Sequence, residues 1–112
     1  MKDREYRIAL QNFLGKLQER ENKYVQEVDL KQFPHNTPNP ASFSVMSGRK
    51  YDRIVRHTYG QRSAYAFIHK ETGAILKASS WNQPDPAKYQ RGNIYAENCL
   101  AGTERYGVVY LR

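Results

Sequence analysis

The chain has 112 residues, a net charge of +7 and a composition that is 39% hydrophobic and 12% aromatic. These values predict one folded domain over residues 1–112 and argue against a disordered polymer. The single cysteine excludes an internal disulfide and a cysteine-rich zinc site. No apolar run approaches the ~20 residues that span a bilayer, and the charged N-terminal segment lacks the apolar core of a signal peptide. We therefore expect a cytoplasmic protein, with no cofactor and no metal.

The first predicted element is an amphipathic helix over residues 3–28. Its apolar residues recur three, four or seven positions apart and so form one stripe. Asp3 and Glu5 lie near its start, where the helix dipole favours negative charge. Gly15 costs the helix up to ~1 kcal/mol relative to alanine, but the stripe continues past it. The stripe comprises Tyr6, Leu10, Phe13, Leu14, Leu17, Tyr24, Val25 and Val28.

A proline-rich connector follows the helix over residues 32–42, which read "QFPHNTPNPAS". Three prolines in this stretch are incompatible with a helix or a central strand, because proline fixes one backbone angle and donates no hydrogen bond. Residues 43–112 are then expected to hold a sheet and its loops.

Strand-like alternation of apolar and polar residues begins after the connector. It predicts a short strand over 43–46 and an antiparallel meander over 49–80, in which "YGQR" and "ETG" are turns. The returning strand of the meander is "AILKASSW", residues 74–81. Beyond it, two prolines predict a loop with a short helical turn at 86–90, and "GVVYLR" reads as a final strand.

These elements predict an α+β fold, with the N-terminal amphipathic helix packed on an antiparallel meander of three to five strands. The helix stripe must bury itself, and one face of the sheet is its only large partner. The other face must then meet water or a ligand.

Positive charge concentrates in the middle of the chain. Residues 49–91 hold nine Lys and Arg against three Asp and Glu, whereas residues 1–33 are nearly neutral. A local excess of this kind attracts polyanions, and cations placed between flat rings suit single-stranded nucleic acid: the cations neutralise phosphates and the rings stack on bases. The candidate phosphate-binding residues are Arg49, Lys50, Arg53, Arg56, Arg62, Lys77, Lys88 and Arg91, and the candidate stacking residues are Tyr51, Tyr65 and Trp81.

The leading functional hypothesis is therefore non-enzymatic binding of nucleic acid, with single-stranded DNA or RNA favoured. The alternative for each ring is ordinary core packing, and for the arginines a solvated face. No RNP-type aromatic motif, zinc-finger spacing or helix-turn-helix supports the hypothesis from another direction.

Two further functions remain open. His57 and His69 fall on one nominal sheet face beside basic residues, which are the groups that a small metal-free ribonuclease needs. The broad helix stripe could instead dock on a partner protein or on a second copy of the chain as a homodimer. Cys99 has no neighbouring base in the sequence and is expected to be a buried structural thiol.

Residues 50–95 contain, in order, "YDRIV", "RSAYAFI", "ETGAILKASSW", a proline-containing loop and "RGNIY". This series resembles a family of small bacteriophage-encoded proteins of uncharacterised function. The resemblance implies a phage origin and expression inside an infected bacterium. With it, the alternative to nucleic-acid binding is a phage protein-interaction factor that binds a host protein, or a minor virion component. It implies no activity and transfers no functional residue.

Overall fold

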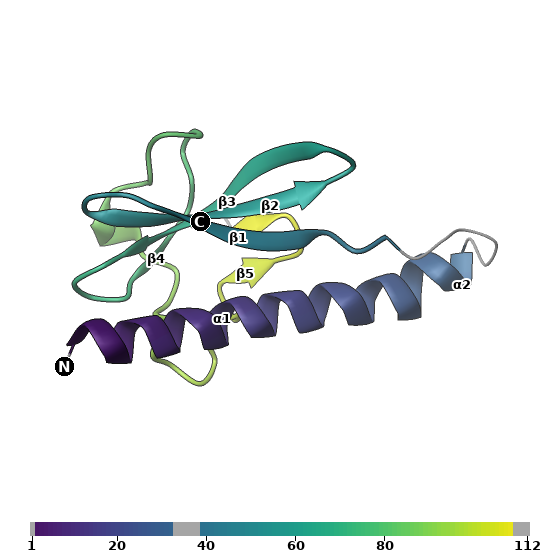
Figure 1. The fold of residues 1–112 in the computed structure, drawn as a ribbon, viewed down its shortest axis with the longest axis horizontal. Coiled ribbons are helices and arrows are strands. Elements are labelled where there is room, and N and C mark those ends of the chain that lie inside the picture. The colour runs from purple at the N-terminus through teal and green to yellow at the C-terminus, as the bar shows by residue number, and fades with distance from the viewer. Residues whose placement is uncertain (1, 33–38, 109–112) are drawn as a thin grey trace.

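A long N-terminal helix forms one side of the molecule (Figure 1). The computed structural model describes residues 2–32 and 39–108. Helix α1 spans Lys2–Tyr24, a π-helical segment continues over Val25–Asp29, and a last turn, α2, spans Leu30–Gln32. The predicted helix is confirmed, although it begins one residue earlier and its helical course continues four residues further than the stripe indicated. The predicted connector falls mostly on residues 33–38, which lie outside the described residues.

Four strands form an antiparallel sheet in the order β1-β2-β3-β4. Their bounds are Ser42–Ser47, Tyr51–Thr58, Gln61–His69 and Ile75–Leu76. Between β2 and β3, Tyr59 and Gly60 both have positive φ angles, 48° and 76°. Two positive φ angles define the tight hairpin turn whose twist matches that of the flanking strands. The predicted meander and the α+β class are both confirmed.

The last part of the chain folds back beside the helix. A single 3-10 turn, Ala87–Tyr89, lies where the short helical turn was predicted. Strands β5, Thr103–Glu104, and β6, Gly107–Val108, form a separate two-stranded sheet, which lies between α1 and the larger sheet in Figure 1. The predicted final strand begins as β6, and its residues 109–112 lie outside the described residues.

The predicted strand over 74–81 is wrong beyond Leu76. Backbone N–H groups of Ser79 and Ser80 both donate to the carbonyl of Gln83, at 2.9 and 3.1 Å, and the Ser79 hydroxyl donates to the same oxygen. Serine side chains compete with strand pairing by bonding nearby backbone. The chain therefore leaves the sheet after two residues and turns back.

A β-bulge in β3 decides which side chains face the helix. Ile54 pairs with Ala66, but the next residue, Val55, pairs with Ala64, so Tyr65 is an extra residue in the ladder. An extra residue breaks the alternation of side chains between the two faces. Tyr65 consequently turns toward the helix, whereas the unbroken alternation had placed it with Phe67 on the opposite face.

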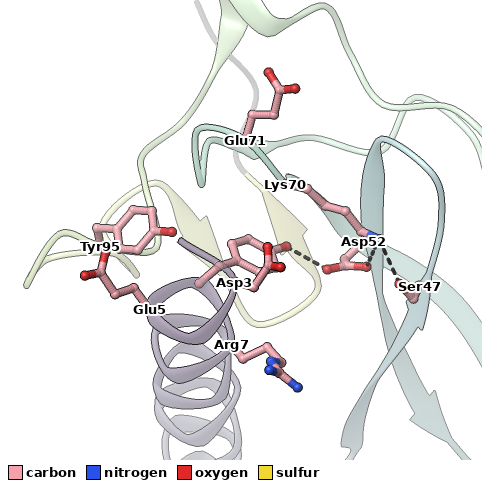
Figure 2. A pocket seen from close by; sticks show the side chains of 9 residues that line it. Asp3, Glu5, Arg7, Ser47, Asp52, Lys70, Glu71 and Tyr95 are labelled. Carbon is pink, nitrogen blue, oxygen red and sulfur yellow. Dashed lines mark hydrogen bonds and ion pairs between the residues drawn. The ribbon is translucent and has the colours of Figure 1, made fainter. Parts of the chain in front are cut away.

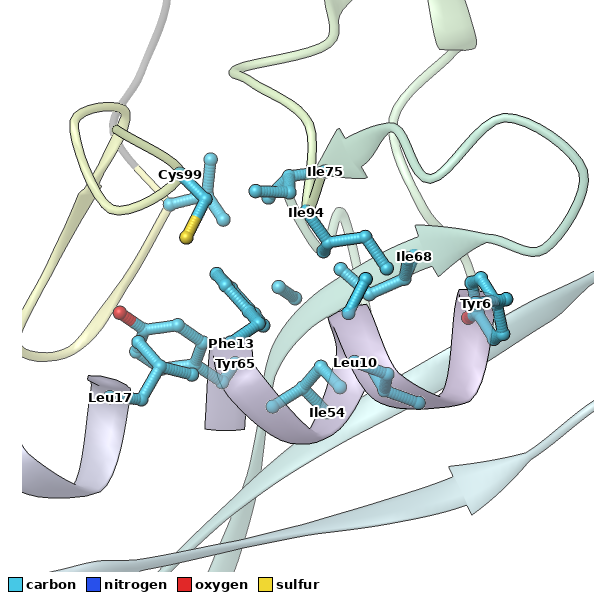
Figure 3. Packing of buried hydrophobic residues seen from close by; sticks show 13 residues of the cluster. Tyr6, Leu10, Phe13, Leu17, Ile54, Tyr65, Ile68, Ile75, Ile94 and Cys99 are labelled. Atoms are coloured by element: carbon cyan, nitrogen blue, oxygen red, sulfur yellow. The ribbon is translucent and has the colours of Figure 1, made fainter. Parts of the chain in front are cut away.

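The main core lies between α1 and the sheet (Figure 3). The helix stripe packs on residues from the sheet and from the C-terminal segment. Phe13 and Ile54 are fully buried, and Cys99 is 2% exposed, in agreement with the expected structural thiol. Buried apolar area of this kind contributes about 25 cal/mol per Å². The cluster comprises Tyr6, Ala9, Leu10, Phe13, Leu17, Ile54, Tyr65, Ala66, Ile68, Ile75, Ile94, Cys99 and Val108.

Glu21 is a buried carboxylate that joins the helix to three other segments. It is 2% exposed. Arg105 donates to both of its oxygens at 3.0 Å, Arg56 of β2 lies 3.9 Å away, and the backbone N–H of Ala41 donates at 3.1 Å. Burial by itself would raise the pKa of Glu21, but the hydrogen bonds from Arg105 and Ala41 and the charges of both arginines hold that pKa below its ordinary value.

We expect Glu21 to make the stability of the fold depend on acid. Because its pKa is lowered in the folded state, its contribution is complete above the ordinary value of 4.5 and is lost as the pH falls through the folded value. Glu21→Gln should cost about 3–5 kcal/mol of unfolding free energy near neutral pH, since it leaves buried charge unpaired. Urea denaturation from pH 3 to pH 7 should show this difference shrinking below pH ~4.5.

The matched control is Glu19→Gln, which removes the same charge from an exposed position on α1. This control should change the unfolding free energy by less than about 0.5 kcal/mol at every pH. An equal effect of the two substitutions would contradict the structural role of Glu21.

Candidate functional site

Three predicted site residues meet on the face of the sheet that is turned away from α1. The guanidinium carbon of Arg53 lies 4.7 Å from the centre of the Trp81 ring, and that of Arg62 lies 5.3 Å from it. Both separations fall in the range in which an aromatic ring attracts a cation. We call Arg53, Arg62 and Trp81 the Trp81 cluster.

The loop after β4 brings the indole to these arginines. Ala78 and Pro84 form an isolated bridge, and the turn that Gln83 closes between them places Trp81 near the tip of the loop. The N–H of Asn82 donates to the Ser80 hydroxyl at 3.3 Å and stiffens this tip. A local turn therefore holds Trp81, which is half-buried. The sequence had instead predicted Trp81 as the last residue of a strand.

Strand pairing positions the two arginines. Arg53 of β2 pairs with Phe67 of β3, and its guanidinium lies 5.6 Å from the Phe67 ring. Arg53 Nη2 also donates to Asn82 Oδ1 at 3.2 Å, and Nη1 lies 3.6 Å from Met46 Sδ. These contacts, which the sequence analysis missed, fix the direction of the Arg53 side chain. Arg62 is exposed at the start of β3.

The face that carries the Trp81 cluster has no acidic residue in its strands. Asp52 is the one Asp or Glu within β1, β2 and β3, and it faces the helix side, where it accepts a hydrogen bond from Tyr6. The cluster therefore keeps its positive charge without a neighbouring carboxylate on these strands. The outward positions of the three strands are Ser42, Ser44, Met46, Tyr51, Arg53, Val55, His57, Arg62, Ala64, Phe67 and His69.

A second group of predicted residues lies at the other end of the same face. The ring of Tyr51 makes edge contacts with Phe67 and His69, with ring centres 6.3 and 5.3 Å away. Lys50 lies over the Tyr51 ring at 5.6 Å, and Arg49 is exposed in the turn between β1 and β2. Tyr51 is half-buried and so offers only part of its ring to a ligand.

Three further predicted cations lie along the loop that leaves β4. Asp85 donates its N–H to the carbonyl of Lys77 at 2.8 Å. Lys88 is exposed and lies 5.0 Å from the Tyr89 ring, and the Arg91 side chain donates to the Tyr89 carbonyl. Seven of the predicted cations thus fall into three groups, which lie in the β1–β2 turn, in the Trp81 cluster and on the loop after β4.

Two of the predicted site residues are inside the fold, and their assignment to a nucleic-acid interface is wrong. Arg56 is 7% exposed, because it alternates with Arg53 on β2 and therefore points toward Glu21. Tyr65 is 1% exposed, because the bulge turns it inward. Its hydroxyl accepts a hydrogen bond from Arg20 at 2.8 Å and donates to the carbonyl of Glu104, so neither of its ring faces can meet a base.

The two histidines of the nuclease alternative are far apart. His69 pairs with Tyr51, whereas His57 lies six residues further along β2, which corresponds to about 20 Å. The ring nitrogen Nε2 of His57 lies 2.6 Å from the Ser44 hydroxyl, and Nδ1 of His69 accepts the Glu71 N–H at 3.2 Å. An acid and a base for one phosphate must both reach it, so this pair cannot serve as the acid and base of one reaction.

A pocket of about 1060 Å³ lies at the N-terminal end of α1 and was not predicted (Figure 2). At its base, the Tyr6 hydroxyl donates to Asp52 Oδ2 at 2.7 Å. Burial and this hydrogen bond raise the pKa of Tyr6 above its ordinary value, so the phenol stays protonated. The sequence did contain one signal, since Asp52 is an acidic residue within a predicted strand.

We expect the fluorescence of Trp81 to report the integrity of the cluster, because Trp81 is the only tryptophan. Arg53→Gln removes the closer cation and uncovers part of the ring. The emission maximum should move to longer wavelength, quenching by acrylamide should increase, and stability should fall by about 0.5–2 kcal/mol. Arg4→Gln, an exposed substitution on α1, should change none of the three. Identical emission and quenching in the two variants would contradict the contact.

Within residues 2–32 and 39–108, no three His, Cys, Asp or Glu side chains lie close enough together to hold a metal ion. Over the same part of the chain, no helix has both the length and the apolar character to cross a bilayer.

Comparisons with known proteins give one match. No curated protein and no solved structure matches the chain. A family model does match, and it covers residues 3–106, which include α1 and the C-terminal sheet as well as the stretch of 50–95 whose motifs resembled phage proteins. The chain therefore belongs to DUF7717, a family of unknown function.

Proposed function

We propose that the protein binds single-stranded nucleic acid on the outward face of its four-stranded sheet, without catalysing a reaction. The observation that carries the proposal is the Trp81 cluster, in which two guanidinium groups are fixed beside one indole on a face whose strands hold no carboxylate. Fixed cations lose little side-chain entropy when they bind phosphate, and guanidinium groups can bind phosphate through two hydrogen bonds.

In this proposal the arginines and the indole of the Trp81 cluster have different roles. Arg53 and Arg62 bind phosphate oxygens, while the indole orients both guanidinium planes. Trp81 therefore acts first as a platform for the arginines and only through its remaining exposed part as a stacking surface. Bases of a single strand stack on planar guanidinium groups as well as on aromatic rings, which suits this arrangement.

The outer cations extend the same surface. Arg49 and Lys50 lie in the β1–β2 turn, and Lys77, Lys88 and Arg91 lie on the loop after β4. Under this proposal a flexible single strand bends to reach cations on both the turn and the loop. A rigid duplex contacts fewer of these positions, so we propose that single strands are preferred.

We further propose that this binding takes place in the cytoplasm of a phage-infected bacterium. The support is the resemblance of residues 50–95 to small phage-encoded proteins. Under this proposal the nucleic acid is phage or host single-stranded DNA or RNA, and a host protein is the rival partner.

Titration of a labelled single-stranded oligonucleotide, followed by fluorescence anisotropy at several salt concentrations, tests the proposal. Arg53→Gln/Arg62→Gln should weaken binding at least about tenfold at low salt. It should also reduce the slope of log K against log salt by about 1.4, at about 0.7 for each lost phosphate contact. Arg62→Gln alone should give about half of both effects and, being an exposed substitution, should not disturb the fold.

The matched control is Arg4→Gln/Lys23→Gln, which removes the same charge from exposed positions on α1. It should retain most of the affinity and the full salt slope. Equal losses of affinity in the two double variants would show that the attraction is not specific to the Trp81 cluster and would contradict the proposal. Displacement of the oligonucleotide by polyglutamate as effectively as by unlabelled single strand would do the same and favour an acidic protein partner.

A further inference from the structure

The pocket at the N-terminal end of α1 lies on the opposite side of β2 from the Trp81 cluster. It is formed by the first two turns of α1, the β1–β2 edge, the β3–β4 turn and Tyr95. Its volume of about 1060 Å³ is large enough for a small organic molecule or a long side chain. The lining residues are Asp3, Glu5, Tyr6, Arg7, Ser47, Asp52, Lys70, Glu71 and Tyr95.

A buried carboxylate forms the base of this pocket. The side chain of Asp52 is 5% exposed, and Figure 2 shows it between the end of α1 and Lys70. Tyr6, itself buried, donates to Oδ2 and thereby fixes the orientation of the carboxylate. The side chain is thus held in one position before any ligand arrives.

The second oxygen of this carboxylate accepts no hydrogen bond. Among the residues that the structure describes, Asp52 Oδ1 is a buried acceptor with no hydrogen-bond donor. Lys70 Nζ forms an ion pair with it at 3.7 Å but donates its hydrogen bond to the Ser47 hydroxyl at 3.0 Å. A buried acceptor without a donor is costly, and a ligand that brings an N–H group would remove that cost.

The charge of the pocket is opposite to that of the chain. Four carboxylates, Asp3, Glu5, Asp52 and Glu71, line it against two cations, Arg7 and Lys70, in a protein whose net charge is +7. Asp3 and Glu5 lie in the first turn of α1, where they offset the positive end of the helix dipole. The positive end of a helix by itself attracts anions. In this pocket the acidic side chains repel them.

Aromatic rings complete the lining. Tyr95 is 51% exposed at the rim, and its ring is packed against the turn that contains Gly73. A Cβ added at Gly73 would lie 2.6 Å from Tyr95 Cε2, so this approach requires glycine, whose φ of 77° also favours glycine. The ring is thereby held where a cation in the pocket can lie against its face.

We propose that this pocket binds an organic cation that carries N–H donors, a guanidinium or primary ammonium group, with Asp52 Oδ1 as its principal acceptor. The carboxylates of the rim attract the cation and the Tyr95 ring packs against its stem. The site is independent of nucleic-acid binding, because it uses other residues on the other face of the sheet. The cation is either a free small amine or the side chain of a lysine or arginine of another protein.

Titration of the ¹⁵N-labelled full chain with agmatine, followed by NMR chemical shifts, tests the proposal. Amide signals of Asp52, Lys70, Glu71 and Tyr95 should shift together, with half-saturation at or below about 1 mM, which corresponds to about −4.1 kcal/mol. Succinate should shift none of them. Comparison of agmatine with N-acetylarginine amide distinguishes a free small amine from a protein side chain. Tighter binding of N-acetylarginine amide assigns the site to a protein side chain.

Two substitutions should move the affinity in opposite directions. Asp52→Asn should weaken agmatine binding about tenfold or more, because it removes the charged acceptor. Lys70→Gln should strengthen it several-fold, because the competing ammonium is lost. Glu27→Gln, which removes one charge from an exposed position near the far end of the helical segment, should leave the affinity unchanged.

If Asp52→Asn does not fold, the proposal is tested with Lys70→Gln and Glu71→Gln, since neither position is buried. Glu71→Gln should weaken binding. An absence of shifts with agmatine at about 10 mM, more than about ten times the expected half-saturation, would overturn the proposal. Weaker binding in Lys70→Gln would do so too.

Discussion

The buried carboxylate of Glu21 is the interaction on which the arrangement of the molecule depends. A carboxylate is rarely buried without partners, because its loss of hydration is costly. Here the partners come from three separate segments, namely Ala41 before β1, Arg56 in β2 and Arg105 between β5 and β6. An apolar surface alone therefore cannot pack against the helix, because it offers Glu21 no hydrogen-bond donor or positive charge. It must meet the sheet and the C-terminal segment in one register.

Strand β2 divides the chemistry of the protein between two faces. Asp52, Ile54 and Arg56 point toward α1, where they supply a pocket carboxylate, a core residue and the partner of Glu21. Arg53 points the other way, toward Trp81. Alternation along one strand thus separates an acidic pocket from a basic surface, although the residues that define them are neighbours in the chain. The sheet lies between the two and keeps their opposite charges from neutralising each other through direct contact.

Much of the fold could be predicted from periodicity. The stripe that begins at Tyr6, the alternation around Phe43 and Val55, and the glycine of each turn report local backbone preferences that tertiary packing did not override. The failures had local and tertiary causes. Serine side chains near Ser79 bond the backbone and end β4 early, and the bulge at Tyr65 inserts one residue into a ladder whose partner strand must be known before the insertion is visible.

The candidate sites show the same division. The distribution of charged residues along the sequence located the positive excess, and the composition showed a single indole. Hydrophobic periodicity and the prolines located the helix, the meander and the loop. Which cations remain outside was decided by the fold. Arg53 and Arg56 are three residues apart on β2 and so point to opposite faces: Arg53 is half-buried beside Trp81, whereas Arg56 is only 7% exposed. One bulged residue sends Tyr65 inward. Asp52 became the base of a pocket only because α1 brings Tyr6 to it across 46 positions of sequence. Local sequence determines which helix or strand each residue joins. Burial and strand pairing each depend on two segments at once, so only the packing of those segments determines them.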